Sequence, residues 1–161
     1  DDAGAAPDLV VYNPSGRVRG PVADLDPVEV RAALDVTAFG AFLVAREAAK
    51  RMLAKGEGTM LFTGASAGIK GFAQSAPFAM GKFALRGLCQ SLARELHPKN
   101  IHVVHFVIDG SIYRPDRGAP FDDPEKTLHP DEIARTYLEL SRQHRSAWTN
   151  EVELRPYVER F

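Results

Sequence analysis

This sequence lacks a pair of cysteines that could form a disulfide, an excess of charge of either sign, and long apolar runs. The single cysteine, Cys89, has no partner for an internal disulfide and lies in an apolar stretch where a buried thiol is expected. The 20 Lys and Arg side chains nearly balance the 21 Asp and Glu side chains, so the basic surface that nucleic acids or anionic membranes require is lacking. No apolar run approaches the roughly 20 residues of a membrane-spanning helix. These absences favour a soluble, cytoplasmic protein with no nucleic-acid partner and no membrane partner.

What is present is an alternation of short buried strands and longer helices. The spacing of apolar residues predicts strands at 8–13, 59–64, 101–108 and 151–156, and helices at 26–55, 78–96 and 129–144. Asp26, Pro27 and Glu29 supply the N-cap, the first-turn proline and the capping-box acid of the first helix. Buried strands that alternate with helices predict a single α/β domain built on a parallel sheet with right-handed crossovers.

Two histidines on the third predicted strand raise the question of a metal site. His102 and His105 are three positions apart, and residues at that spacing on a strand point to opposite faces of the sheet. The two imidazoles therefore cannot share an ion, and we predict no metal centre.

The glycine-rich stretch TGASAGIKG, at residues 63–71, follows a predicted strand as a dinucleotide-binding turn would. Such a turn needs a glycine where the backbone meets the phosphates, a helix that opens at once, and an acidic residue about 20 positions later. Lys70 occupies the glycine position, FAQSAP separates the stretch from the next helix, and the nearest acid, Glu95, lies inside a helix. We do not expect it to cradle a pyrophosphate, although a loop at this edge of a parallel sheet is a place where a ligand can lie.

Phe78 and Lys82 are four positions apart where the helix at 78–96 begins. That spacing lays the two side chains next to each other on one helical face. An enzyme could hold a phenol beside an ammonium in this way, but Phe78 has no hydroxyl. Two interpretations are open: an active-site pair whose proton donor has been lost, or a piece of helical core with a lysine that snorkels from its edge.

Short motifs at the ends of the predicted elements follow one another in a familiar order. VYNPSG resembles a strand end N-N-A-G, DVTAFG resembles D-V-N-x-x-G, TGASAG resembles S-S-x-x-G, FAMGK resembles Y-x-x-x-K, and IDG stands where P-G would follow a strand. In this order they are similar to the carboxyl-terminal two thirds of the short-chain dehydrogenase/reductases. The resemblance implies a Rossmann-like, doubly wound parallel sheet in three α/β/α layers.

The resemblance also implies roles for particular residues. In the family a tyrosine transfers the substrate proton, a lysine lowers its pKa and binds the nicotinamide ribose, a serine orients the carbonyl, and an asparagine holds a water. Lys82 keeps the lysine, whereas Phe78 stands at the tyrosine, Ala65 with Ser66 beside it at the serine, and Thr37 at the asparagine. A phenyl ring has no proton to transfer. The chain therefore resembles a divergent branch of the family that carries phenylalanine at this position.

Further residues are predicted near the site. Tyr113, just past the third strand, is a candidate for a relocated phenol, and its alternative is an exposed tyrosine in the long surface loop at 111–129, where the family has its substrate lid. The resemblance implies that Asn13, Lys82, Gly110 and Ile112 line the nicotinamide side of NAD or NADP.

The family's glycine-rich dinucleotide turn belongs to strands that would precede Asp1. We therefore expect a single Rossmann-like domain over residues 1–161 that lacks its first strands and that turn, with a further amino-terminal portion to complete it. The predicted function is that of an NAD(P)-dependent oxidoreductase on a small carbonyl or alcohol substrate. The alternative is an inactive binding or scaffold protein with the same fold. Pairing through the helices around Ala41 and Leu88, as in the family, predicts a homodimer or homotetramer.

Overall fold

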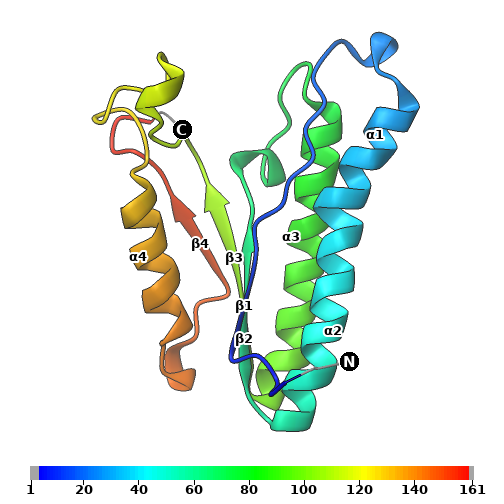
Figure 1. The fold of residues 1–161 in the computed structure, drawn as a ribbon, viewed down its shortest axis with the longest axis vertical. Coiled ribbons are helices and arrows are strands. Elements are labelled where there is room, and N and C mark those ends of the chain that lie inside the picture. The colour runs from blue at the N-terminus through cyan, green and yellow to red at the C-terminus, as the bar shows by residue number, and fades with distance from the viewer. Residues whose placement is uncertain (1–3, 160–161) are drawn as a thin grey trace.

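The computed structural model describes residues 4–159, in which four parallel strands form one sheet in the order β1-β2-β3-β4. The strands are β1 Leu9–Tyr12, β2 Gly58–Thr63, β3 Ile101–Ile108 and β4 Glu151–Leu154, and the α-helices are α1 Pro27–Leu34, α2 Gly40–Lys55, α3 Ala76–Leu96 and α4 Pro130–Ser141. Helices α1, α2 and α3 cover one face of the sheet and α4 covers the other (Figure 1). This arrangement confirms the predicted three-layer α/β fold.

The core lies on both faces of β3, whose eight residues are all buried. Continuous apolar sequence is expected of a strand that helices cover on both sides. Met60, Phe62 and Val103 pack toward α2 and α3, while Leu61 and Phe106 pack toward α4. Alternate residues of each strand therefore supply two separate apolar clusters.

The first predicted helix is continuous but not uniform. It begins as expected, with Pro27 at its first turn and the Asp26 carboxylate accepting the Val28 N–H at 2.8 Å. Between α1 and α2 the segment Asp35–Phe39 has the wider π-helical turn, which the sequence pattern did not predict. Gly56, in the left-handed conformation with a φ of 88°, ends α2.

The two histidines of β3 lie in different surroundings, as their spacing predicted. The ring of His102 stacks on Trp148, with 4.6 Å between the centroids. His105 instead contacts Glu151 of β4. In the part of the chain that the structure describes, no group of three or more metal-binding side chains is found. No helix there has the length and apolar character needed to cross a membrane.

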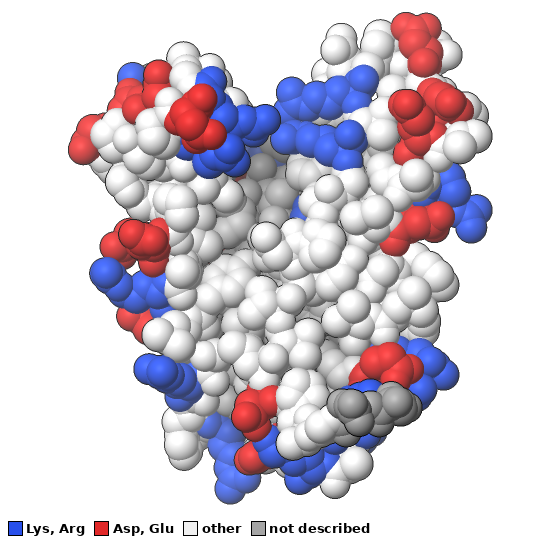
Figure 2. Space-filling model, viewed as in Figure 1, with Lys and Arg blue, Asp and Glu red and all other residues white. Residues whose placement is uncertain are grey.

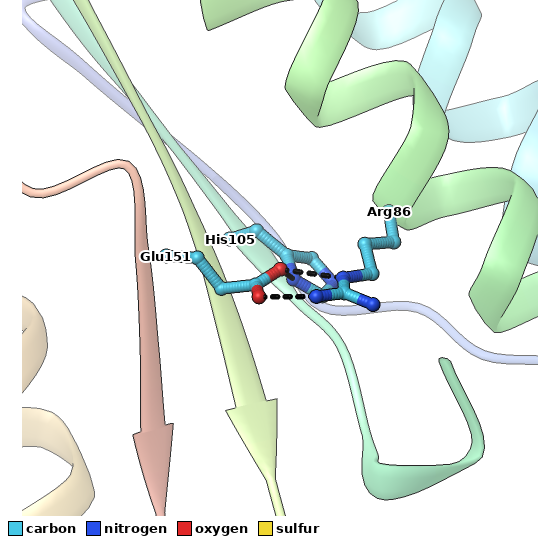
Figure 3. Close-up of polar contacts among 3 residues, drawn as sticks. All are labelled: Arg86, His105 and Glu151. Carbon is cyan, nitrogen blue, oxygen red and sulfur yellow. Dashed lines mark hydrogen bonds and ion pairs between the residues drawn. The ribbon is translucent and has the colours of Figure 1, made fainter. Parts of the chain in front are cut away.

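A charged cluster joins α3 to the last two strands (Figure 3). The Arg86 guanidinium donates two hydrogen bonds to the Glu151 carboxylate, at 2.8 and 2.7 Å. The same carboxylate lies 2.9 Å from Nδ1 of His105. Burial lowers the pKa of His105, and the carboxylate opposes that shift. The neutral ring then donates its Nδ1–H to Glu151, and the cluster fixes β4 at the edge of the sheet.

Candidate active site

The predicted site residues gather at the carboxyl edge of the parallel strands, where ligands bind in open α/β sheets. The loops after β1, β2 and β3 all emerge at this edge (Figure 1). Figure 2 shows a hollow there between two lobes, with basic side chains on both rims. The candidate site is therefore built from three loops and the first turns of α3.

Lys82 is the deepest charged group of the site. Its side chain leaves α3 and is 3% exposed, and its Nζ donates a hydrogen bond of 2.8 Å to the Thr63 carbonyl oxygen at the end of β2. Burial, and after it the positive charge of Arg17, lowers the pKa of Lys82 to about 8. The alternative of a snorkelling lysine at the helix edge is wrong, because the ammonium points inward.

Phe78 lies beside Lys82, as their spacing predicted. The Lys82 Nζ is 5.8 Å from the centre of the Phe78 ring. The guanidinium carbon of Arg17 lies closer, 4.4 Å from the same centre. Both distances are within reach of a cation–π attraction. The Phe78 ring is therefore in contact with two cations.

Arg17 was not singled out from the sequence. It lies in the loop after β1, just past the VYNPSG motif, and the signal that could have found it is its place at the carboxyl end of a parallel strand. Burial, followed by the charge of Arg19, lowers the pKa of Arg17.

Thr37 fixes the loop that carries Arg17. Its hydroxyl oxygen accepts the Gly16 N–H at 2.8 Å, and the side chain is 1% exposed in the π-helical segment. A Cβ at Gly16 would lie 2.5 Å from the Ala33 Cα, so the loop passes α1 too closely for any side chain there. Thr37 is thus a positioning residue for this loop.

Ser66 lies beyond the end of β2, in the 3₁₀ segment Ser66–Gly68. Its side chain is therefore not bound to point to the opposite face of the sheet from that of Ala65, as it would be on a strand. This segment packs against α3 at Lys82, since a Cβ at Gly68 would lie 3.0 Å from the Lys82 carbonyl oxygen. Ser66 is half-buried. The structure therefore brings its segment next to the backbone of Lys82.

The remaining predicted residues lie along the same edge. Asn13 follows β1 and is exposed. Gly110 has a φ of 151°, and a Cβ there would lie 2.7 Å from Pro156, so this position favours glycine. Ile112 pairs with Leu128 in an isolated bridge that closes the base of the loop at 111–129.

Tyr113 is half-buried and stacks on His129, with 4.9 Å between the ring centroids. Its backbone N–H donates to the Leu128 carbonyl oxygen at 2.8 Å. The loop tyrosine is therefore held in place rather than free in solvent. Among residues 4–159, no hydrogen bond or ring contact joins it to Lys82. Its proton-transfer role stays a prediction.

A second phenol, which the sequence analysis missed, lies on the opposite face of the sheet. The Tyr137 hydroxyl is 2.7 Å from the Thr63 hydroxyl, and its ring stacks on Phe106 at 3.6 Å. Burial raises the pKa of Tyr137 to about 12. Tyr137 belongs to α4, whereas Lys82 belongs to α3, so the phenol and the ammonium approach Thr63 from different layers.

Comparisons with known proteins agree with this fold. A family model described as short chain dehydrogenase matches residues 6–111. The trans-4-hydroxycyclohexanecarboxylate dehydrogenase of Sinomonas cyclohexanicum is 34% identical over 108 residues, which are 67% of this chain and 41% of that enzyme. The crystal structure of a short-chain dehydrogenase from Rhodopseudomonas palustris superposes with a TM-score of 0.81 and 38% identity, over 97% of this chain and 65% of that one.

A 4-hydroxyisoleucine dehydrogenase complexed with NADH and succinate shares the fold, with a TM-score of 0.79 at 22% identity over 94% of this chain and 67% of that one. The parallel sheet, with its site at the carboxyl edge, defines a Rossmann-like α/β protein. The chain belongs to the short-chain dehydrogenase family. It spans less than half the length of the Sinomonas relative.

Proposed function

We propose that this protein is an NAD(P)-dependent oxidoreductase that interconverts an alcohol and a carbonyl compound at an atypical active site. The observation that carries the proposal is the Lys82 ammonium, buried at the carboxyl edge of the sheet and bonded to the Thr63 carbonyl oxygen. A buried cation destabilises a fold unless its charge is compensated. A functional role therefore explains this lysine better than stability does.

Lys82 is suited to hold the ribose of a nicotinamide cofactor. An ammonium has three N–H donors, and the Thr63 carbonyl is the one acceptor that residues 4–159 offer it. The remaining donors fit the hydroxyls of a ribose, and Asn13, Gly110 and Ile112 would line the nicotinamide side. NAD or NADP, when bound, supplies the hydride acceptor or donor.

A proton must accompany the hydride, and the Phe78 ring has none to give. With its pKa near 8, Lys82 exchanges a proton readily around neutral pH. Tyr113 is the second candidate donor. Ser66 and Thr37 are polar helpers in this proposal, and the hydrogen bond from Gly16 to Thr37 favours a positioning role for the latter.

The proposal assigns the chain to a divergent branch with phenylalanine in place of the catalytic tyrosine. It also includes an amino-terminal portion that carries the first strands and the glycine-rich turn. Support comes from β1, an edge strand with Leu9 43% and Val11 49% exposed. An apolar groove beside β1, lined by Val10, Leu43 and Val44 among others, offers further surface to cover. Edge strands of this kind are normally paired or covered.

The alternative function is a binding or scaffold protein that keeps the fold without turnover. The observation that favours it is the hydrocarbon ring of Phe78, which leaves the family's proton-transfer position empty of a donor. Proton transfer by a positioned group contributes about 100- to 10,000-fold in rate, so its loss is a serious handicap.

The two functions are separated with purified full-length protein. NADH and NADPH are titrated by fluorescence, and the protein is then assayed against a panel of carbonyl compounds and alcohols. Turnover that Lys82→Met abolishes supports the oxidoreductase, and loss of that turnover in Tyr113→Phe would assign the proton to Tyr113. Cofactor binding without any turnover supports the scaffold. If neither cofactor binds, the oxidoreductase proposal is wrong, and a scaffold function would not involve NAD or NADP.

A further inference from the structure

The cations of the candidate site have no carboxylate beside them. Elsewhere on the molecule several basic side chains are paired with acids, as Arg86 is with Glu151 and Arg114 with Asp116. Neither Arg17 nor Lys82 forms an ion pair with any residue in the described range 4–159. Two positive groups therefore face one edge of the sheet without a counter-ion from the chain.

Neighbouring positive charges disfavour the protonated forms of both groups. The charge of Arg17 contributes to the lowered pKa of Lys82, and the charge of Arg19 contributes to the lowered pKa of Arg17. Like charges held close together favour the binding of an anion, because the anion removes the repulsion. The loop after β1 and the first turns of α3 thus form a positive pole at the mouth of the site.

The guanidinium of Arg17 is held in place before any ligand arrives. Its carbon lies over the Phe78 ring at 4.4 Å, and the preceding Gly16 is bonded to the buried Thr37 hydroxyl. Stacking on a ring leaves the edge of the guanidinium, with its N–H donors, free to bind. Such an edge recognises the paired oxygens of a carboxylate or a phosphate.

We propose that Arg17, stacked on Phe78, binds an anionic oxygen group of the substrate, so that the site selects alcohols or carbonyl compounds bearing a carboxylate or a phosphate. Phe78 then has a positive role as the platform for the guanidinium. Arg17 contacts the substrate directly and determines the substrate specificity of the site. The identification of the bound anion as part of a substrate rests on the proposed function, whereas the binding of the anion itself does not.

Binding of small anions tests the proposal without turnover. Full-length protein is titrated calorimetrically with succinate, with inorganic phosphate and with the neutral dimethyl ester of succinate. We expect the anions to bind and the ester not to bind. Arg17→Gln is expected to weaken the binding about tenfold or more, as for the loss of a hydrogen bond to a charged group. Of succinate and phosphate, the one that binds more tightly identifies the source of the oxygens.

Three variants sharpen the test. Arg17→Lys keeps the charge but not the planar fork, and is expected to bind more weakly than wild type and more tightly than Arg17→Gln. Phe78→Leu keeps Arg17 but removes the ring face, and is also expected to weaken the binding. Arg46→Gln is the matched control, since Arg46 is an exposed arginine of α2 paired with Glu47, and it should leave the binding unchanged.

The outcomes separate this proposal from the function on which it rests. Equal anion affinity in wild type and Arg17→Gln, or equal affinity for succinate and its ester, overturns the proposal whatever the enzyme does. A loss of NADH affinity in Arg17→Gln as large as its loss of succinate affinity also overturns it, since the cation would then serve the cofactor. Anion binding that depends on Arg17, in a protein without turnover, supports the anion site and refutes the oxidoreductase.

Discussion

Arg86 of helix α3 and Glu151 of strand β4 form a bidentate ion pair, with N–O distances of 2.8 and 2.7 Å. Their side chains are 29% and 28% exposed, so solvent screens the pair only in part. In the described sheet β4 pairs with β3 alone. The contact therefore replaces some of the support that a strand inside a sheet receives from its second neighbour.

Removing this ion pair should destabilise the protein. We expect Arg86→Met to lower the free energy of unfolding by about 2 kcal/mol, between the values for exposed and buried pairs. Urea denaturation at neutral pH measures the change. The control is Arg135→Met, whose pair with Glu132 lies on the surface of α4 with both side chains more than 60% exposed. A loss no larger in Arg86→Met than in that control would contradict the prediction.

The stability of the protein should rise with pH in the alkaline range because of Lys82. Its pKa is lowered from 10.5 to about 8 in the folded chain, while the unfolded chain keeps the ordinary value. Between these values the unfolded chain binds more protons, so raising the pH favours the folded state. The full gain from the shift is about 3 kcal/mol.

Urea denaturation of wild type and Lys82→Met over this pH range isolates that gain. The charged and titratable groups that interact with Lys82 are Arg17, Cys89 and His105, and all are unchanged in the variant. Burial raises the pKa of Cys89, which opposes the gain, but it does so in both proteins. The difference between them should therefore grow in favour of wild type as the pH rises. Parallel curves would show that the ammonium is not buried.

Restoring the missing phenol should raise the rate. In Phe78→Tyr the hydroxyl would join the Lys82 ammonium at the family's proton-transfer position, and we expect turnover of an active substrate to increase about 100-fold or more. Steady-state kinetics with the preferred cofactor measure it. Phe72→Tyr is the matched control, because its ring lies near a different lysine, Lys70, at 5.7 Å, whereas the Phe78 ring lies near Lys82. An unchanged rate in Phe78→Tyr would show that another group already supplies the proton.

We propose that the protein self-associates through the outer face of the layer formed by α2 and α3. Phe42 of α2 and Phe83 of α3 are each about half exposed there, as is Phe39 just before α2, whose ring stacks on Phe42 with 6.1 Å between the ring centroids. Apolar patches of this kind mark interaction surfaces. Light scattering should find a homodimer or homotetramer, and Phe42→Glu should shift it toward monomer. Val22→Glu, at an apolar residue 79% exposed elsewhere, should not. Wild type that is wholly monomeric would refute the proposal.

Much of the fold could be predicted because its signals are local. The apolar run of β3 and the Asp26 cap of α1 each lie within a few consecutive residues, and helical spacing alone put Phe78 beside Lys82. The π-helical turn at Asp35–Phe39 could not be foreseen, because its residues suit an ordinary helix equally well.

The contacts that the sequence analysis missed join distant segments of the chain. Glu151 meets Arg86 across 65 positions and His105 across 46. Tyr137 reaches Thr63 across 74 positions. The periodicity of a sequence does not predict such long-range contacts, since they depend on how the layers of the fold pack together. Arg17 is of the same kind: its loop was expected, but not the ring on which its side chain rests.

Thr63 occupies a junction between the two outer layers. Its carbonyl oxygen accepts a hydrogen bond from the Lys82 ammonium on one face of the sheet, and its hydroxyl is hydrogen-bonded to the Tyr137 hydroxyl on the other. A shift of α4 would therefore pull on the same residue that anchors Lys82. A ligand that moved α4, for example by closing the loop at 111–129, would therefore change the pKa of Lys82 on the other face of the sheet.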